Sequence, residues 1–387
     1  MKHILFLAIN MGGGGAEKVL VNLINALDHK KYQISLLTYT LDNARNNEIK
    51  NKVDFINIMN GNNLFCGKKV QKKQALFSAV LLKSFSGIFL NSISNIYGYE
   101  VKFAFLDSYR TTKFMPCQED GNVTILRIAS DYTMPSSGFM TWKRTELPIQ
   151  FKMHTDIYPT MTHVVAGSQG AADAFLEATG LTSTVTIINN MFDIRAIQAA
   201  ANEPIEIIKQ KFVIGTVGRF HPIKGHMRLI EVCNKLNHDG FDFELWLIGT
   251  GDDELALKEK VAEYNMSNVY FWGYQENPHK YMKQFDLYVN PAFSEGFPNA
   301  VSEAVILGLP CVVADHAGEK EIFGQHNEYG LVVENSTEGL YDGVRQLLSN
   351  RALYEHYKTT VLQRQEFFKK ERVLAQYEQL FGEGAIV

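Results

Sequence analysis

The feature that most limits how this chain can fold is a strand–loop–helix–strand unit that occurs twice. In the first copy, an unbroken apolar run at 3–9 precedes glycines 12–15, a helical apolar pattern at 20–27 and a second apolar run at 32–39. Apolar runs without alternation are typical of parallel strands that are covered on both faces. Because parallel neighbours need a crossover connection, usually a helix, this unit predicts an α/β fold.

The second copy begins past residue 210. It has predicted strands at 212–217 and 243–248, followed by helical patterns at 226–238 and 253–264. Further strands are predicted at 53–58, 101–106, 123–129, 163–167, 268–271, 286–289 and 310–313, and further helices at 298–308, 337–349 and 366–381. The chain is therefore expected to form two doubly wound, Rossmann-like sheets.

The length of 387 residues suits two domains of ordinary size. We place an N-terminal domain at 1–200, a C-terminal domain at 201–365 and a final helix within 366–387. Ligands of open α/β sheets bind beyond the carboxyl ends of the strands, so we expect a cleft for ligands where the two domains face each other.

Composition excludes several classes of protein. The net charge of −4 lacks the basic excess of a nucleic-acid-binding protein, although it divides into +5 over 1–200 and −9 over the rest. The four cysteines have no close spacing, which argues against a zinc site or a disulfide framework. The run at 3–9 is too short for a signal peptide, and Lys83 interrupts the apolar stretch at 75–90. A cytoplasmic protein without a membrane span is expected.

Glycines 12–15 lie at the turn between the first strand and the first helix. They do not form the dinucleotide fingerprint G-x-G-x-x-G, because Glu17 or Lys18 stands where the last glycine belongs. The backbone of Gly14 and Gly15 is expected to approach a ligand or the other domain, and a merely tight turn is the alternative.

Two cations follow the first strand of the second unit. Arg219 and Lys224 belong to the loop that starts at Gly218, at the carboxyl end of that strand. Together they can clamp a diphosphate and neutralise a leaving group, and two solvated surface cations are the alternative. The acids at 252–254 are better explained by helix capping and the helix dipole than by a metal.

The most informative stretch covers 290–304. Glu295 lies in a predicted loop, Pro298 suits a first helical turn, and Glu303 falls within the helix. Backbone N–H groups near 297–300 are expected to face a phosphate. The two carboxylates can accept hydrogen bonds from hydroxyls of a sugar or a ribose.

These stretches, taken in order over nearly the whole chain, resemble a retaining glycosyltransferase of family 4, of the bacterial surface-polysaccharide type, with the two-Rossmann-domain GT-B fold. The matching stretches are GGGGAEKVLVNLINAL at 12–27, VVAGSQGAADAFLEATG at 164–180, IINNMFD at 187–193, GRFHPIKG at 218–225, LIGTGDDEL at 247–255, VYFWGY at 269–274 and SEGFPNAVSEAVILGLPCV at 294–312.

The resemblance implies a role for each candidate residue. Arg219 and Lys224 hold the diphosphate of a nucleotide-sugar. Glu295 orients the donor sugar, and Glu303 binds the ribose. Further contacts with the donor are implied for Gly14, Gly15, Gly218, Gly273, Tyr274, Phe297, Pro298 and Asn299. Such enzymes require no metal, and their final helix crosses back to the N-terminal domain.

One position departs from the resembled family. Many of its members carry a histidine near the end of the strand before the acceptor pocket, and Asp131 stands there in this sequence. An aspartate can position an acceptor hydroxyl or accept its proton, and a loop-bonding or capping residue is the alternative. His154 and His163 are other candidates, although a lone histidine is more often structural.

A lysine-rich stretch at 68–73 precedes the apolar stretch at 75–90. A basic, partly amphipathic segment can lie on an anionic membrane surface, and a solvated lysine cluster before a core helix is the alternative. Many enzymes of the resembled family act on lipid-linked acceptors. We therefore expect 68–90 to contact the inner face of the cell membrane peripherally.

The function that the resemblance implies is transfer of a sugar from a nucleotide-sugar, such as a UDP- or GDP-sugar, to a hydroxyl acceptor with retention. A glycan or a lipid-linked saccharide in cell-surface polysaccharide synthesis is the expected acceptor, and no cofactor other than the donor is expected. The alternatives are a nucleotide-sugar epimerase or sugar phosphorylase on the same fold, or a non-catalytic nucleotide-sugar-binding protein.

Overall fold

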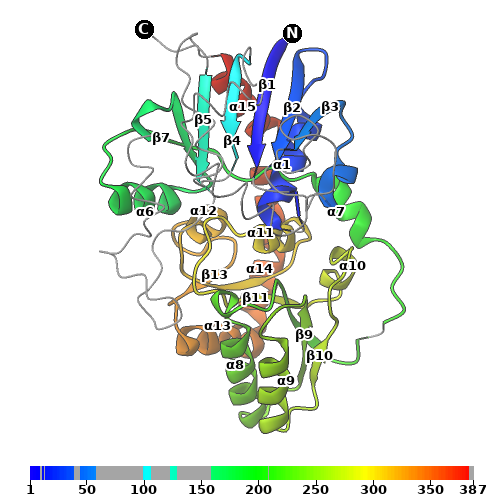
Figure 1. Cartoon of the computed structure of the whole chain (residues 1–387). Coiled ribbons are helices and arrows are strands. Elements are labelled where there is room, and N and C mark those ends of the chain that lie inside the picture. Colours follow the sequence, from blue (N-terminus) through cyan, green and yellow to red (C-terminus); the bar gives the residue numbers. More distant parts are fainter. Residues whose placement is uncertain are drawn as a thin grey trace, which may run out of the picture.

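The computed structural model describes residues 1–8, 11–12, 14–38, 44–57, 99–105, 123–128, 158–207 and 209–382. These residues form two parallel β-sheets with associated helices, one above the other in Figure 1.

The N-terminal sheet has the strand order β3-β2-β1-β4-β5-β6-β7 within the described residues. Its strands are β1 (Lys2–Ala8), β2 (Tyr32–Thr38), β3 (Val53–Asn57), β4 (Val101–Ala104), β5 (Val123–Ile128), β6 (His163–Ala166) and β7 (Val185–Ile187). All neighbouring strands pair in parallel. The order reverses between β1 and β4, so the glycine loop after β1 leaves the sheet at its switch point.

The helical elements of this half are α1 (Gly15–Ala26), η1 (Ala44–Glu48), η2 (Tyr158–Thr160), α6 (Gln169–Thr179) and α7 (Ile194–Ala201). In α1, Leu20, Leu23 and Ile24 recur at helical spacing and are buried in one core with the strands. Helix α6 begins at a capping residue, since the Ser168 side chain accepts a hydrogen bond from Ala171 N–H.

The last helix, α15 (Lys370–Gly382), packs on the N-terminal sheet rather than on the sheet that precedes it in the chain. Val373, Tyr377 and Phe381 are buried in the same hydrophobic core as β1 and β4. The rings of Tyr377 and Phe103 are 5.5 Å apart between centroids. In Figure 1, α15 accordingly lies behind the strands of the upper sheet.

The C-terminal sheet has the order β10-β9-β8-β11-β12-β13, again with parallel pairing throughout. Its strands are β8 (Phe212–Val217), β9 (Phe243–Ile248), β10 (Val269–Phe271), β11 (Leu287–Asn290), β12 (Cys311–Ala314) and β13 (Leu331–Val333). The order reverses between β8 and β11, which makes the loops after these two strands neighbours.

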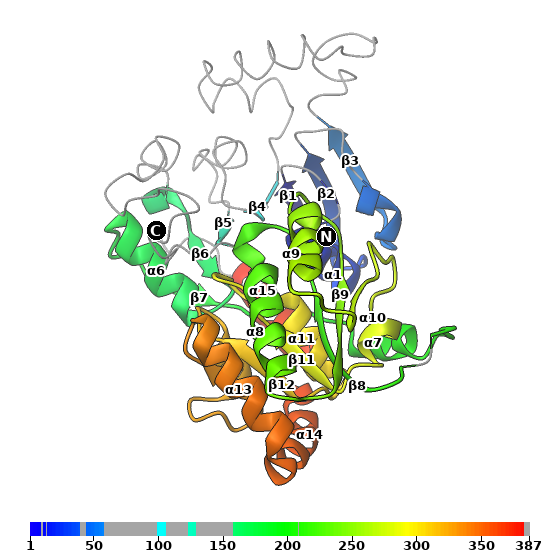
Figure 2. The ribbon, with the colours of Figure 1, turned by 90° about the horizontal axis from the view of Figure 1, so that it is seen from below.

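The helical elements of this half are η3 (Pro222–Lys224), α8 (His226–His238), α9 (Glu254–Glu263), α10 (His279–Met282), α11 (Asn299–Ile306), α12 (Glu319–Phe323), α13 (Thr337–Ser349), α14 (Arg351–Gln363) and η4 (Arg364–Phe368). Helices α8 and α13 lie side by side, as Figure 2 shows from below. Helix α11 begins just below α1 in Figure 1, where the two halves meet.

The structure confirms the predicted α/β class with two doubly wound sheets, and it corrects several details. Strands β7 and β13, of three residues each, were not predicted. The single helix expected at 366–381 is divided into η4 and α15. Pro298 is the N-cap of α11 and not part of its first turn. Asp253 is the N-cap of α9 and Glu254 lies in its first turn, as the explanation by capping and the helix dipole requires, but the Asp253 side chain makes no capping hydrogen bond.

Candidate functional site

The switch point of the C-terminal sheet brings two candidate residues together. The loop after β8 ends in the short helix η3, which carries Lys224, and the loop after β11 carries Glu295. The Lys224 ammonium forms an ion pair with Glu295 Oε1. The side chains are 31% and 19% exposed, so the pair is only partly screened by water and remains open to a ligand.

Arg228 of α8 anchors the loop after β11 through hydrogen bonds to its backbone. Its buried guanidinium donates to Pro291 O at 2.6 Å, to Ala292 O and to Asn335 Oδ1 at 2.9 Å, and it lies 4.1 Å from the Phe293 ring centroid. Burial lowers the pKa of Arg228 to about 10, so the group stays charged at neutral pH. The backbone that carries Glu295 is therefore fixed within its own half of the molecule.

The carboxyl ends of β8, β9 and β10 are joined through backbone hydrogen bonds. Gly218 N–H donates to Ile248 O at 3.0 Å, and Gly249 N–H donates to Gly273 O at 2.9 Å. A Cβ on Gly249 would come within 2.0 Å of Gly218 O, so the close approach requires glycine there. At this edge Tyr274 is exposed, with open space above Gly273.

Arg219 is not brought into the Lys224–Glu295 pair. Its side chain is exposed, and the described part of the chain gives it neither a hydrogen bond nor an ion pair. The structure thus places Arg219 at the correct edge of the sheet, at the carboxyl end of β8, without bonding it to the other candidates.

Glu303 of α11 lies apart from Glu295 and has a partner of its own. The Nε2 atom of His279 in α10 is 3.4 Å from Glu303 Oε2. Nothing in the sequence pattern had indicated this histidine, because the two residues lie on different helices.

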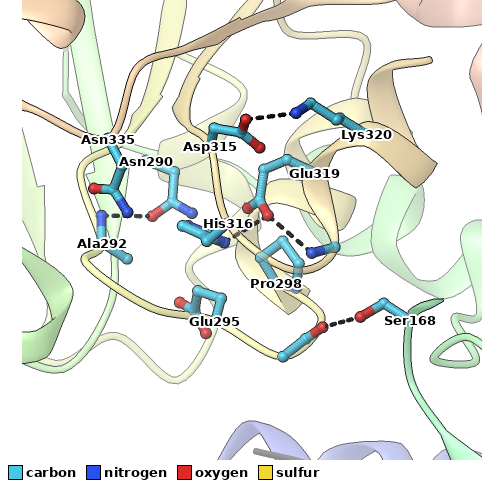
Figure 3. A network of polar contacts seen from close by, with 12 residues as sticks. Ser168, Asn290, Ala292, Glu295, Pro298, Asp315, His316, Glu319, Lys320 and Asn335 are labelled. Atoms are coloured by element: carbon cyan, nitrogen blue, oxygen red, sulfur yellow. Dashed lines mark hydrogen bonds and ion pairs between the residues drawn. The ribbon is translucent and has the colours of Figure 1, made fainter. Parts of the chain in front are cut away.

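The start of α11 touches the N-terminal half directly. Asn299 Nδ2 donates to Gly15 O at 2.9 Å, and Asn299 Oδ1 accepts from Asn190 Nδ2 at 2.5 Å. Ser168 Oγ, which is fully buried, donates to Gly296 O at 2.6 Å (Figure 3). The loop with Glu295 and the helix that follows it are therefore hydrogen-bonded to hydroxyl, amide and backbone groups of the N-terminal half.

A second set of contacts across the interface ends on Glu321 of α12. Its carboxylate accepts hydrogen bonds from Gln169 N–H and, at 2.9 Å, from Asn189 Nδ2. Burial raises the pKa of Glu321, and the two hydrogen bonds oppose that rise. Buried Arg127 joins this interface to α15, since it donates to Tyr377 Oη at 3.0 Å and to Asn190 Oδ1.

A buried acid–imidazole pair lies behind the loop that carries Glu295. His316 Nδ1 is 2.5 Å from Glu319 Oε2, with side chains 2% and 0% exposed, and Gly318 N–H also donates to this carboxylate (Figure 3). Burial raises the pKa of Glu319, against the opposite influence of His316, and the charge of Glu295 raises it further.

The remaining candidates divide between the two sides of the interface. Gly14 is the N-cap of α1, and the atoms nearest to a Cβ there belong to the side chain of Glu17. Phe297 is buried, and its carbonyl accepts a long hydrogen bond from Asn190 Nδ2 at 3.5 Å. Asp131 and the stretch 68–90 lie outside the described residues.

Two features are absent from the described residues. No group of histidine, cysteine, aspartate and glutamate residues is arranged to hold a metal ion. No helix in the same ranges is long and apolar enough to span a membrane.

Sequence reasoning missed the residues that position the candidates. Asn190 and Ser168 lie within stretches that carry the family resemblance, but no chemistry marks them in the sequence. Arg228 resembles any basic residue in an amphipathic helix until its acceptors are known. These residues act through contacts distant in sequence, which local patterns do not contain.

The two parallel sheets, with polar loops where they meet, define the fold class. Solved GT-B glycosyltransferases have the same architecture: Anabaena HepE in complex with UDP and glucose superimposes with a TM-score of 0.69, at 17% identity and covering 98% of this chain and 99% of that one. A TarM variant from S. aureus, solved with UDP, gives a TM-score of 0.73 at 13% identity and covers 99% and 100% of the two chains. The expected GT-B fold is therefore confirmed.

A family match covers most of the C-terminal half. Residues 198–364 match the family described as Glycosyl transferases group 1, so this protein contains a glycosyltransferase group 1 domain and is a glycosyltransferase. Nearly the full length of the chain is also similar to a protein of Campylobacter jejuni, N-acetylgalactosamine-N,N'-diacetylbacillosaminyl-diphospho-undecaprenol 4-alpha-N-acetylgalactosaminyltransferase. It is 26% identical over 380 residues, which cover 96% of this chain and 97% of the relative.

Proposed function

We propose that this protein transfers a sugar from a nucleotide-sugar to a hydroxyl of a lipid-linked saccharide, with retention of anomeric configuration and without a metal ion. The observation that carries the proposal is the Lys224–Glu295 pair at the switch point of a glycosyltransferase group 1 domain. A cation and a carboxylate suited to a diphosphate and to sugar hydroxyls lie there side by side.

The donor site is assigned to the edge formed by the loops after β8, β10 and β11. When the donor binds, Lys224 leaves Glu295 and pairs with the diphosphate, and the Arg219 side chain turns toward the same diphosphate. Glu295 then accepts a hydrogen bond from the donor sugar. Glu303 accepts from the ribose, and Tyr274 covers the base. The UDP in the HepE and TarM structures supports a nucleotide-sugar of this kind.

In the reaction, the bond between the anomeric carbon and the diphosphate oxygen breaks. The acceptor oxygen bonds to the anomeric carbon on the same face, and the acceptor proton passes to the leaving diphosphate. Lys224 and Arg219 stabilise the charge that develops on that group. The contacts of Ser168 with the loop that carries Glu295, and of Gly15 and Asn190 with the start of α11, keep the two halves closed and exclude water.

The acceptor is assigned by analogy with the Campylobacter jejuni relative, whose name specifies a diphospho-undecaprenol-linked saccharide. A lipid-linked acceptor of this kind places the enzyme at the membrane surface. The segment 68–90, which we propose as its peripheral contact with anionic lipid, belongs to the N-terminal half. Asp131, which we propose to position the acceptor hydroxyl, belongs to the same half.

A panel of UDP- and GDP-sugars tests the proposal. One donor is expected to raise the melting temperature, since a ligand at about one hundred times its Kd stabilises by about 2.7 kcal/mol. The same donor should then glycosylate a polyprenyl-diphosphate saccharide in the presence of EDTA, with the product anomer read by NMR. An inverted anomer, a metal requirement or an epimerised donor without transfer would contradict the proposal.

A further inference from the structure

His279 stands beside Glu303 at the edge of the assigned donor site. Its Nε2 atom is 3.4 Å from Glu303 Oε2, and the side chains are 16% and 19% exposed. Within the described ranges, His279 is the only basic side chain at ion-pair distance from Glu303. The position of the His279 imidazole therefore influences how the Glu303 carboxylate is oriented.

The backbone that carries the imidazole is anchored by hydrogen bonds. Asn277 Oδ1 accepts a hydrogen bond from His279 N–H at 3.1 Å, and Asn277 Nδ2 donates to Ala200 O at 2.8 Å. The start of α10 is thereby tied to the end of α7. These anchors position the start of α10, and both side chains of the contact with Glu303 are largely buried.

The imidazole nitrogen cannot itself reach a ligand. The Nε2 atom is buried and has no hydrogen-bond partner among the described residues, whereas the Glu303 side chain is partly exposed. A separation of 3.4 Å is slightly too long for an N–H···O bond, and such contacts often tighten when substrate binds. A buried donor facing one carboxylate oxygen leaves the other oxygen for the ligand.

We propose that His279 is a positioning residue for nucleotide recognition. It holds Oε2 of Glu303 so that Oε1 accepts a hydrogen bond from a ribose hydroxyl, an inference that rests on the proposed function. The enzyme then distinguishes ribose from deoxyribose through a pair of residues of which only Glu303 touches the nucleotide.

Two conservative variants separate positioning from a general structural role. Glutamine places its N–H close to the position of Nε2, whereas asparagine is too short to reach Glu303. Binding of UDP and GDP, and of their 2′-deoxy and 3′-deoxy forms, is measured by calorimetry on the full chain. We expect His279→Asn to weaken binding of the preferred nucleotide about tenfold. The variant should then bind this nucleotide no more tightly than its 2′-deoxy or its 3′-deoxy form, whichever lacks the hydroxyl that Glu303 recognises. His279→Gln should bind within about twofold of the wild type.

A double-mutant cycle completes the test. Glu303→Ala should weaken binding at least as much as His279→Asn, and the double variant should lose nothing more, because both changes remove one interaction. The control His238→Asn, at the exposed end of α8, should bind normally. If circular dichroism shows that His279→Asn does not fold, His279→Leu replaces it, with the same expected loss.

The possible failures are distinguishable. If neither UDP nor GDP binds the wild type, the proposed function is overturned together with this inference. If a nucleotide binds and Glu303→Ala weakens it while His279→Asn does not, or if the two losses add, only the role of His279 is overturned.

Discussion

The two halves of this molecule share one architecture but present different chemistry where they meet. At the switch point of the C-terminal sheet the loops carry an ion pair, Lys224 with Glu295. The groups of the N-terminal half that are named above as bonding directly to the Glu295 loop and to the start of α11 are uncharged: the Gly15 carbonyl, the Ser168 hydroxyl and the Asn190 amide. A repeated fold thus does not imply a repeated function.

The difference indicates a division of labour. The C-terminal loops are anchored within their own half by Arg228, so their charges are held ready for a charged ligand. The groups of the N-terminal half bond to those loops and can orient them without competing for a diphosphate. Charge should therefore matter most on the C-terminal side, and neutral complementarity on the N-terminal side.

The largest effect is expected from the charges at the switch point. Glu295→Gln and Lys224→Ala should each lower kcat by about a thousandfold, about 4 kcal/mol, because each removes a charge from the reacting centre. Steady-state transfer assays measure the loss, and thermal unfolding checks the fold.

A matched ion pair on the surface provides the control. Lys235 pairs with Glu338 at 2.7 Å on the exposed faces of α8 and α13, and Lys235→Ala should leave kcat unchanged. The double variant Lys224→Glu with Glu295→Lys restores an ion pair, but the cation no longer lies where the diphosphate is proposed to bind, nor the carboxylate where the sugar is. Recovery of activity in this double variant would show that the pair is merely structural.

The next effect concerns the anchoring of the C-terminal loop. Arg228→Met should lower the free energy of unfolding by about 3 kcal/mol, because it leaves buried carbonyls without a donor. Urea unfolding measures the change. Arg345→Met, at an exposed position of α13, should alter the same quantity by less than about 0.5 kcal/mol. Equal stability of the two variants would show that Arg228 does not anchor the loop.

The sequence predicted the parts of this fold that depend on local pattern. Helices at 226–238 and 337–349 were predicted with the bounds that the structure has, since apolar spacing determines a buried stripe. Lys224 and Glu295 were both expected at carboxyl ends of strands, and the structure pairs them. Their pairing requires β8 and β11 to be neighbours, which no local pattern specifies.

The contacts between the halves could not be predicted for the same reason. Asn299 and Gly15 are 284 positions apart, and Ser168 and Gly296 are 128 positions apart. Such contacts depend on how two sheets are placed relative to each other. Side-chain periodicity reports which face of an element is buried, but not which distant element covers it.

A smaller effect, on the pH dependence of stability, is expected from His226, a buried histidine close to Lys224. Burial, and secondarily the charge of Lys224, lowers the pKa of His226 from 6.5 to about 3. Between these values the unfolded chain binds a proton that the folded chain does not. The contribution to stability is therefore complete above 6.5 and is lost progressively as the pH falls toward 3.

The variant His226→Gln lacks this proton uptake. The fall in unfolding free energy from about pH 8 to about pH 5 should be about 2 kcal/mol smaller than in the wild type. Urea unfolding at both pH values measures the difference. His356→Gln, at an exposed position of α14, should show the wild-type dependence. A pH dependence unchanged by His226→Gln would mean that the buried imidazole takes up its proton in the folded state.

The smallest predicted effect tests the neutral side of the comparison. Asn299→Ala removes the contacts with Gly15 O and Asn190 Nδ2, and it should lower kcat/KM about fivefold, about 1 kcal/mol, since each lost bond is an uncharged one at the interface. Asn237 and Asn268 form a similar amide pair wholly within the C-terminal half, at 3.2 and 3.0 Å. Asn237→Ala should therefore leave kcat/KM unchanged even where it lowers stability. A loss after Asn299→Ala as large as that after Lys224→Ala would break the division of labour, because a neutral contact from the N-terminal half would then matter as much as a charge at the switch point.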